Sequence, residues 1–216
     1  MEEQDQEQIQ ADIPAPEQKS KLKLFGIFDV ANVEITDPGL KRVINIEPRL
    51  LLKSHGRARK EFAKTKVHVV ERLICLLQVP GSRGKKHRII TSWSTGKYNR
   101  CAKIVFDALK IVQEKTNQNP IEVLMKAIVN SAPRDGVTAI EYGGARYPQS
   151  VDYSPIKRVN MVLRFLVHGA YDKAFNKKAT ITEAFAKEII LASQNSSESL
   201  AIQKKNDTEK QADAAR

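Results

Sequence analysis

The chain has few of the residues that build metal centres, disulfide frameworks and membrane spans. It contains two cysteines, Cys75 and Cys101, no CxxC or HExxH sequence and no cluster of acidic ligands, so no metal site is expected. Each cysteine lies in an apolar helical pattern, which predicts two reduced core thiols in a cytosolic protein. No run of about 18 apolar residues exists, so we expect no membrane-spanning segment.

The chain also lacks the motifs of nucleotide hydrolysis and of acid–base catalysis. Two Gly-Lys pairs, at 84–85 and 96–97, lack both the upstream glycine and the following Ser or Thr of a phosphate-binding loop. The four histidines have no Ser, Cys or Asp partner at the spacing of a catalytic site. We therefore expect no enzyme activity, no catalytic residue and no cofactor.

Charge, in contrast, is abundant and unevenly distributed. The formal net charge of the 216 residues is +11, yet residues 1–18 carry six acidic side chains and no Lys or Arg. Residues 198–216 carry four charges of each sign, so the segment 19–197 has 32 basic against 15 acidic groups. A folded region with a net charge of +17 favours a polyanionic partner, and nucleic acid is a better fit than a membrane surface.

The pattern of the chain divides it into four segments. Residues 1–21 are polar and acidic, which predicts a disordered tail. Residues 22–65 are predicted to form an extended basic arm that lies on the main domain. We expect much of this arm to order only on RNA. Residues 66–196 read as one helical domain with a hairpin at 137–151. The tail from 197 to 216 has a thin apolar stripe, and we expect it to be helical only against a partner.

Helical periodicity and capping residues predict five or six helices, a mainly α fold. Apolar residues at helical spacing predict helices over 66–78, 97–115 and 180–193. Asn119 and Pro120 are typical of a helix start, Pro133 closes that helix, and Ser154-Pro155 opens the next. Thr180 is the expected cap of the last predicted helix, with Glu183 three residues later.

From 137 to 151 the period changes to two around Gly143-Gly144, which predicts a β-hairpin. Pro148 donates no ladder hydrogen bond, so its strand should be exposed there. The hairpin has little to bury and is therefore expected to protrude. Its tip has two tyrosines that can stack on bases and one arginine for phosphate. The tip residues are Tyr142, Gly143, Gly144, Arg146 and Tyr147.

Basic side chains gather in two loops and on the start of one helix. The runs at 53–66 and 83–88 flank the first predicted helix, and three cations recur along the start of the second, so one continuous patch is expected. The residues predicted to bind the polyanion are Lys53, Arg57, Arg59, Lys60, Lys64, Lys66, Arg83, Lys85, Lys86, Arg88, Lys97, Arg100 and Lys103.

The partner class is narrowed to RNA because no helix-turn-helix spacing is present, and because arms with a protruding hairpin suit irregular folded RNA. A basic helical DNA-binding chromosomal protein stays open as the alternative.

Several ordered motifs resemble the universal small-subunit ribosomal protein seven family, in its archaeal and eukaryotic branch. The similarity covers roughly 23–213. The motifs that carry it are Phe25-Gly26, Asp37-Pro38-Gly39-Leu40-Lys41-Arg42, Thr95-Gly96-Lys97-Tyr98 followed by Ile104-Val105, Asn119-Pro120-Ile121-Glu122-Val123-Leu124, Ala132-Pro133-Arg134, Tyr142-Gly143-Gly144, and Val151-Asp152-Tyr153-Ser154-Pro155 with Lys157-Arg158-Val159-Asn160.

The resemblance implies a structural constituent of the small ribosomal subunit. Such a protein binds the 3′ major (head) domain of small-subunit rRNA, nucleates head assembly, and reaches exit-site tRNA and mRNA with its hairpin. It would contact small-subunit ribosomal proteins nine and eleven, in the cytoplasm, and would have no catalytic role. On this resemblance, Lys157 and Arg158 join the rRNA-binding residues.

The sequence departs from the family pattern at three places. Tyr98 stands where the family has a basic residue after Gly-Lys, about a dozen extra residues lie around 84–93, and the acidic tail 1–18 has no counterpart.

Overall fold

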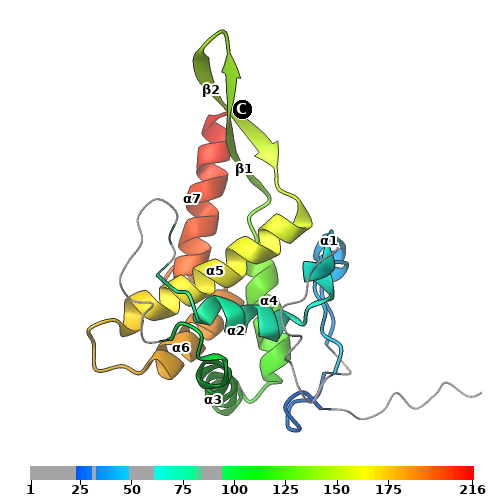
Figure 1. Ribbon diagram of the computed structural model, residues 1–216, viewed down its shortest axis with the longest axis vertical. Helices are drawn as coiled ribbons and strands as arrows, with labels where there is room; N and C mark the ends of the chain where they lie inside the picture. Colours follow the sequence, from blue (N-terminus) through cyan, green and yellow to red (C-terminus); the bar gives the residue numbers. More distant parts are fainter. Residues whose placement is uncertain (1–22, 31–32, 49–60, 82, 84–93) are drawn as a thin grey trace, which may run out of the picture.

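The structure, a computed structural model, describes residues 23–30, 33–48, 61–81, 83 and 94–216. It is mainly helical with one two-stranded antiparallel hairpin, as the sequence predicts (Figure 1). Its elements are α1 (Pro38–Lys41), the 3-10 helix η1 (Ala63–Lys66), α2 (Val69–Leu77), α3 (Tyr98–Thr116), α4 (Pro120–Ser131), β1 (Asp135–Tyr142), β2 (Ala145–Asp152), α5 (Pro155–Ala174), α6 (Ile181–Ser193) and α7 (Leu200–Ala214).

Two of the predicted helix starts are confirmed by their capping contacts, whereas Ser154 precedes α5 without a side-chain cap. Asn119 Oδ1 accepts from the Ile121 amide at 3.0 Å, and Pro120 takes the first helical position, where no amide is required. Thr180 Oγ1 accepts from the Glu183 amide at 3.3 Å and so begins α6. These local contacts explain why the boundaries of α4 and α6 are readable from sequence.

The core forms around α6, which packs against α3, α4 and α5. Phe185 and Ile189 of α6 are fully buried, as are Leu124 of α4, Val105 of α3 and Leu163 of α5. Each of these residues lies on the apolar stripe of its own helix, so the stripes converge on one interior.

The described parts of the N-terminal arm belong to this core. Leu24, Phe28, Leu40 and Val43 are buried in the same apolar cluster as the helices, and the Phe25 ring meets the edge of Phe106 at 5.5 Å between centroids. Residues 23–30 and 33–48 therefore pack against the helical domain, and the expectation that much of the arm orders only on RNA stays a prediction. Residues 49–60 of the arm lie outside the described residues.

The two cysteines have different environments. Cys101 is buried in α3, as expected, but Cys75 is exposed on α2, so the prediction of two core thiols is wrong for Cys75. The inward stripe of α2 runs through Leu73, Ile74 and Leu77, and the turn of the helix places Cys75 outside it.

The C-terminal segment forms α7 and packs within its own chain. It contacts α4, α5 and both strands of the hairpin, and stands beside the hairpin base in Figure 1. The expectation of a helix that needs an external partner is thereby corrected, because the partner surface is supplied by the chain itself.

Candidate nucleic-acid interface

The hairpin projects from the helical domain as an exposed two-stranded ribbon (Figure 1). Its strands pair in register from Asp135 opposite Asp152 to Tyr142 opposite Ala145. Gly143 and Gly144 form the two-residue turn with φ of 58° and 81°, a conformation that side chains rarely adopt. The predicted turn is confirmed, and Pro148 lies on the exposed part of β2, as expected.

The two faces of the hairpin tip carry different chemistry. Ile140 and Tyr147 are cross-strand partners, and Tyr142 is two residues from Ile140, so these three side chains share one face. Tyr142 is 81% exposed and Tyr147 59% exposed. Arg146 lies opposite Glu141 on the other face, with 4.0 Å between Nε and the carboxylate. The tip thus offers a stacking face and, separately, a cationic face weakened by one carboxylate.

A second group of predicted residues lies at the start of α3. Lys97, Arg100 and Lys103 are solvent-exposed, whereas Cys101 and Val105 turn inward from the same helix. Lys97 is the N-cap residue, and no acidic side chain lies in the first turn. The helix start is therefore positive in both its side chains and its macrodipole.

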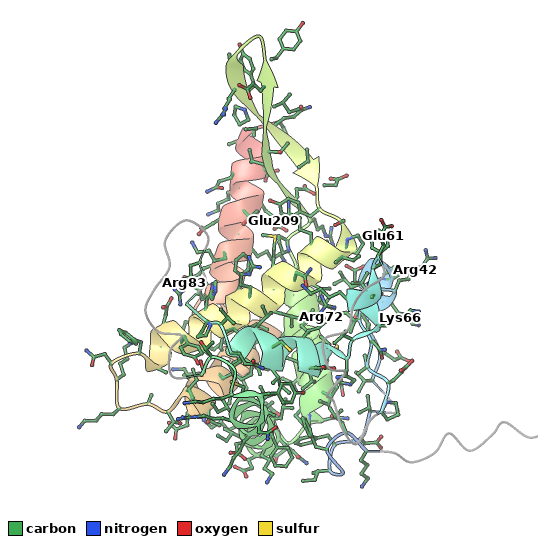
Figure 2. All side chains as sticks on the ribbon, viewed as in Figure 1. Arg42, Glu61, Lys66, Arg72, Arg83 and Glu209 are labelled. Carbon is green, nitrogen blue, oxygen red and sulfur yellow. The ribbon has the colours of Figure 1, made fainter. Side chains whose placement is uncertain are left out.

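A third group surrounds η1. Lys64 and Lys66 are exposed, and Asn45 Nδ2 donates to the Lys66 carbonyl at 2.9 Å, which ties η1 to the segment after α1. Arg42 and Lys66 lie near the same edge of the domain in Figure 2. Phe62 begins η1 and is 71% exposed, with a left-handed φ of 56°.

Sequence reasoning missed Phe62 and a similar site at the end of α5, where exposed Phe175 precedes exposed Lys177 and Lys178. In both places an aromatic ring lies within a few residues of two lysines. The signal in the sequence is the spacing Phe-x-Lys-x-Lys or Phe-x-Lys-Lys, but only exposure distinguishes such a ring from a core ring.

Two predicted RNA-binding arginines instead hold the domain together. Arg83 Nη1 lies 2.8 Å from the Asp172 carboxylate of α5, and Arg158 Nη2 lies 3.0 Å from that of Asp37. Both side chains are less than one-fifth exposed. Arg158 Nε also donates to the Pro133 carbonyl at 3.1 Å. We therefore leave both arginines out of the proposed interface.

The Arg158 contact changes the acidity of Asp37. Burial acts to raise the pKa of this carboxyl, but the Gly39 amide and the Arg158 guanidinium outweigh burial, and the pKa is lowered from 3.8. The carboxylate therefore stays charged and joins α1 to α5.

Lys157, the neighbouring predicted residue, is exposed and lies with Nζ 3.8 Å from the centre of the Tyr153 ring. The other predicted cations stay predictions, because they and the extra residues around 84–93 lie outside the described residues. These cations are Lys53, Arg57, Arg59, Lys60, Lys85, Lys86 and Arg88.

The described residues contain no group of three or more His, Cys, Asp or Glu side chains placed to hold a metal ion. In the same part of the chain, no helix combines the length and apolar character needed to cross a bilayer.

A helical domain with exposed cations on two elements and an exposed aromatic hairpin defines the class of proteins that bind structured nucleic acid. Comparison with known proteins narrows this class. The family model described as "Ribosomal protein S7p/S5e" matches residues 41–216. The chain therefore belongs to this family of ribosomal proteins.

Curated relatives match over nearly the whole chain. The "Small ribosomal subunit protein uS7" of Nanoarchaeum equitans is 45% identical over 197 residues, covering 91% of this chain and 100% of the relative. The proteins of the same name from Archaeoglobus fulgidus and Methanosphaera stadtmanae are each 40% identical, over 199 and 196 residues. They cover 92% and 90% of this chain and 97% and 98% of their own lengths. Membership of a family of structural ribosomal proteins confirms that the chain is not an enzyme.

Proposed function

We propose that the protein is a structural constituent of the small ribosomal subunit that binds the 3′ major (head) domain of the rRNA and nucleates head assembly. The names of its archaeal relatives support the assignment to the small ribosomal subunit, and therefore a location on the ribosome in the cytoplasm. The observation that carries the proposal is the group of exposed cations on η1 and at the start of α3, in a member of a ribosomal family.

Two parts of the molecule have different tasks in this proposal. The cations on η1 and at the start of α3 contact rRNA phosphates and anchor the domain. They are Lys64, Lys66, Lys97, Arg100 and Lys103. The predicted cations at 53–60 and 85–88 would extend the same contact.

The hairpin tip reaches past this anchor toward exit-site tRNA and mRNA. The face with Tyr142 and Tyr147 stacks on bases, which needs no particular sequence, because every base has a π face. Arg146 on the opposite face contacts phosphate. Small-subunit ribosomal proteins nine and eleven are the proposed protein neighbours in the head and on the platform.

Phe62 is added to the anchor as a residue that stacks on an unpaired base. A left-handed φ costs a bulky residue about 1–3 kcal/mol and persists where the surroundings hold it in place. Here Thr65 donates to the Phe62 carbonyl from its amide at 2.9 Å and from its hydroxyl at 2.8 Å. These two hydrogen bonds hold the Phe62 backbone, and the exposed ring stands two residues before Lys64 in the chain.

The salt dependence of rRNA binding tests the anchor. In a variant with Lys97→Gln, Arg100→Gln and Lys103→Gln, the slope of log K against log salt should fall by about 2 to 3, because each lost phosphate contact removes about 0.7–0.9. A matched variant with Lys126→Gln, Lys187→Gln and Lys210→Gln removes three exposed cations from α4, α6 and α7 and should keep the slope.

Equal slopes in the two variants would show that α3 does not form the anchor. Competition between a folded rRNA head fragment and duplex DNA at physiological salt tests the partner class. Preference for the duplex would favour the alternative of a chromosomal DNA-binding protein.

A further inference from the structure

The hairpin needs support from outside its own two strands. Every residue of the ribbon from Thr138 to Gln149 is exposed. Buried and half-buried residues of the two strands occur only at the base of the hairpin. An isolated two-stranded hairpin is only marginally stable in water. The direction in which this one projects must therefore be set where it joins the domain.

Helix α7 provides that support along one side of the hairpin base. The Ser150 amide of β2 donates to the Ala215 carbonyl at 3.3 Å, and Arg216 Nη2 lies 2.9 Å from the Asp135 carboxylate of β1. Lower down, the Arg134 amide donates to Glu209 Oε1 at 3.1 Å, on the side of α7 that faces the hairpin base (Figure 2). Both strands are thus tied to one helix.

The apolar contacts of α7 are too few to position it alone. Only Ala201, Ile202 and Ala212 of its 15 residues are buried. Two of these three are alanines, which bury little surface and give little hydrophobic stabilisation. Polar contacts must therefore help to position α7: Lys205 Nζ donates to the Asn130 carbonyl at 2.8 Å, and a group of buried contacts lies at the first turn.

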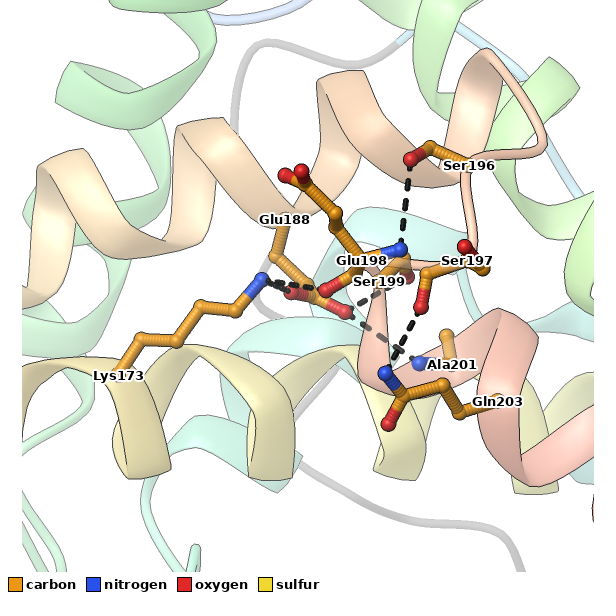
Figure 3. Close-up of polar contacts among 8 residues, drawn as sticks. All are labelled: Lys173, Glu188, Ser196, Ser197, Glu198, Ser199, Ala201 and Gln203. Atoms are coloured by element: carbon orange, nitrogen blue, oxygen red, sulfur yellow. Dashed lines mark hydrogen bonds and ion pairs between the residues drawn. The ribbon is translucent and has the colours of Figure 1, made fainter.

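Those contacts converge on Glu188 of α6, whose side chain is fully buried (Figure 3). Its Oε1 accepts from the Ser199 hydroxyl at 2.7 Å and from the Ala201 amide at 3.3 Å. Its Oε2 lies 2.6 Å from Lys173 Nζ of α5, and the same ammonium donates to the Glu198 carbonyl at 3.1 Å.

This arrangement replaces the usual cap of a helix. Ser199 is the N-cap residue of α7, but its hydroxyl donates to Glu188 instead of accepting a hydrogen bond from its own helix. The carboxylate of α6 then takes the place of the cap at the positive end of α7. Gly169 of α5 leaves the room for it, since a Cβ there would lie 2.8 Å from Glu188 Cδ and 3.0 Å from Leu200 Cβ.

We propose that α7 is a strut that fixes the direction of the hairpin, and that Glu188 is the positioning residue at its foot. The contacts run without a break from Lys173 and Glu188, through α7, to Asp135 and Ser150 at the hairpin base. In this role α7 sets the direction of the hairpin, whatever the hairpin contacts.

Pulsed electron paramagnetic resonance on the full chain tests this. Nitroxides attached at Tyr142→Cys on the tip and Gln113→Cys on α3 report the tip-to-domain distance, in a background where exposed Cys75 is replaced by Ser. With Glu188→Ala the distance distribution should broaden and shift. With Glu188→Gln the change should be smaller, because an amide oxygen still accepts from Ser199 and Ala201.

Amide exchange provides the matching measurement of stability. Protection at 135–138 and 149–152 should fall about tenfold or more in Glu188→Ala, a loss of about 1.4 kcal/mol for each factor of ten. Glu122→Gln removes an exposed ion pair with Lys126 and should leave both measurements unchanged.

Two further variants separate an effect on the direction of the hairpin from an effect on the stability of the domain. Deleting 209–216 removes the hairpin contacts but leaves Glu188 and its partners, so it should broaden the distribution while α3–α6 keep their protection. Val105→Ala weakens the core far from α7. The proposal is overturned if the tip distance stays unchanged in both Glu188→Ala and the deletion, or if Val105→Ala broadens it equally at matched stability.

Discussion

A methyl group added at Gly136 should loosen the base of the hairpin, because the Tyr153 ring occupies the space that the methyl needs. A Cβ at this position would lie 1.8 Å from the Tyr153 hydroxyl oxygen, 1.9 Å from Cζ and 2.6 Å from Cε1. Gly136 has no positive φ, so its backbone would accept alanine. The whole effect of Gly136→Ala is therefore steric.

The expected loss of stability follows from the steric clash and from the contact that the Tyr153 ring would lose. Overpacking typically costs about 1–3 kcal/mol. Moving the ring also loses the contact with Lys157 Nζ, 3.8 Å from its centre, which at an exposed site contributes about 0.5–1 kcal/mol. We expect a loss of about 1.5–4 kcal/mol at the hairpin base, measured as faster amide exchange at 135–138 and 149–152.

Second-site substitutions make this prediction specific. In a double-mutant cycle, Tyr153→Ala should restore most of the exchange protection lost in Gly136→Ala, because it removes the clashing ring. Tyr153→Phe should not, because Cζ remains 1.9 Å from the added methyl. Wild-type protection in Gly136→Ala, or equal rescue by both substitutions, would refute the steric reasoning.

Three further outcomes are expected from other parts of the molecule. Deleting 141–147 should leave the unfolding temperature and rRNA affinity unchanged, because the tip buries nothing, yet weaken exit-site tRNA binding to assembled subunits; loss of the fold would contradict this. The pKa of Asp37 is lowered in the folded protein, so its ion pair with Arg158 stabilises the fold at pH values above the ordinary carboxyl pKa. This stabilisation is lost as the pH falls through the folded-state pKa. In an acid titration, Asp37→Asn should therefore lose stability less steeply than wild type below about pH 4. Phe62→Ala should change stability little, since the ring is exposed, but weaken rRNA binding by about 1–3 kcal/mol, and unchanged affinity would remove Phe62 from the anchor.

Where local contacts decide the structure, the sequence sufficed to predict it. The Asn119 and Thr180 caps bond to amides two and three residues away, so α4 and α6 begin where the sequence places them. The turn at Gly143-Gly144 requires positive φ at both positions, which glycine alone supplies cheaply. Periodicity likewise identified the helices that form the core.

Where residues distant in sequence meet, the same reasoning failed. Arg83 and Arg158 read as surface cations because Asp172 and Asp37 are 89 and 121 residues away in the chain. The segment 23–30 was predicted to be an extended arm, because the contacts of Phe25 and Phe28 with Phe106 of α3 join residues far apart in the chain. The segment 197–216 was predicted to need an external partner, because its contacts with Glu188 and with the hairpin are not visible in its own sequence.

The sequence alone determined that this is a basic, mainly helical protein with a protruding hairpin, and ordered motifs placed it in its family. These properties reside in composition, periodicity and short-range hydrogen bonds. Only the tertiary structure decided which cations reach solvent, which faces of the hairpin carry the tyrosines and Arg146, and what holds the hairpin in place. Such properties depend on distances between segments, and a buried carboxylate such as Glu188 shows its role only beside the helix it caps.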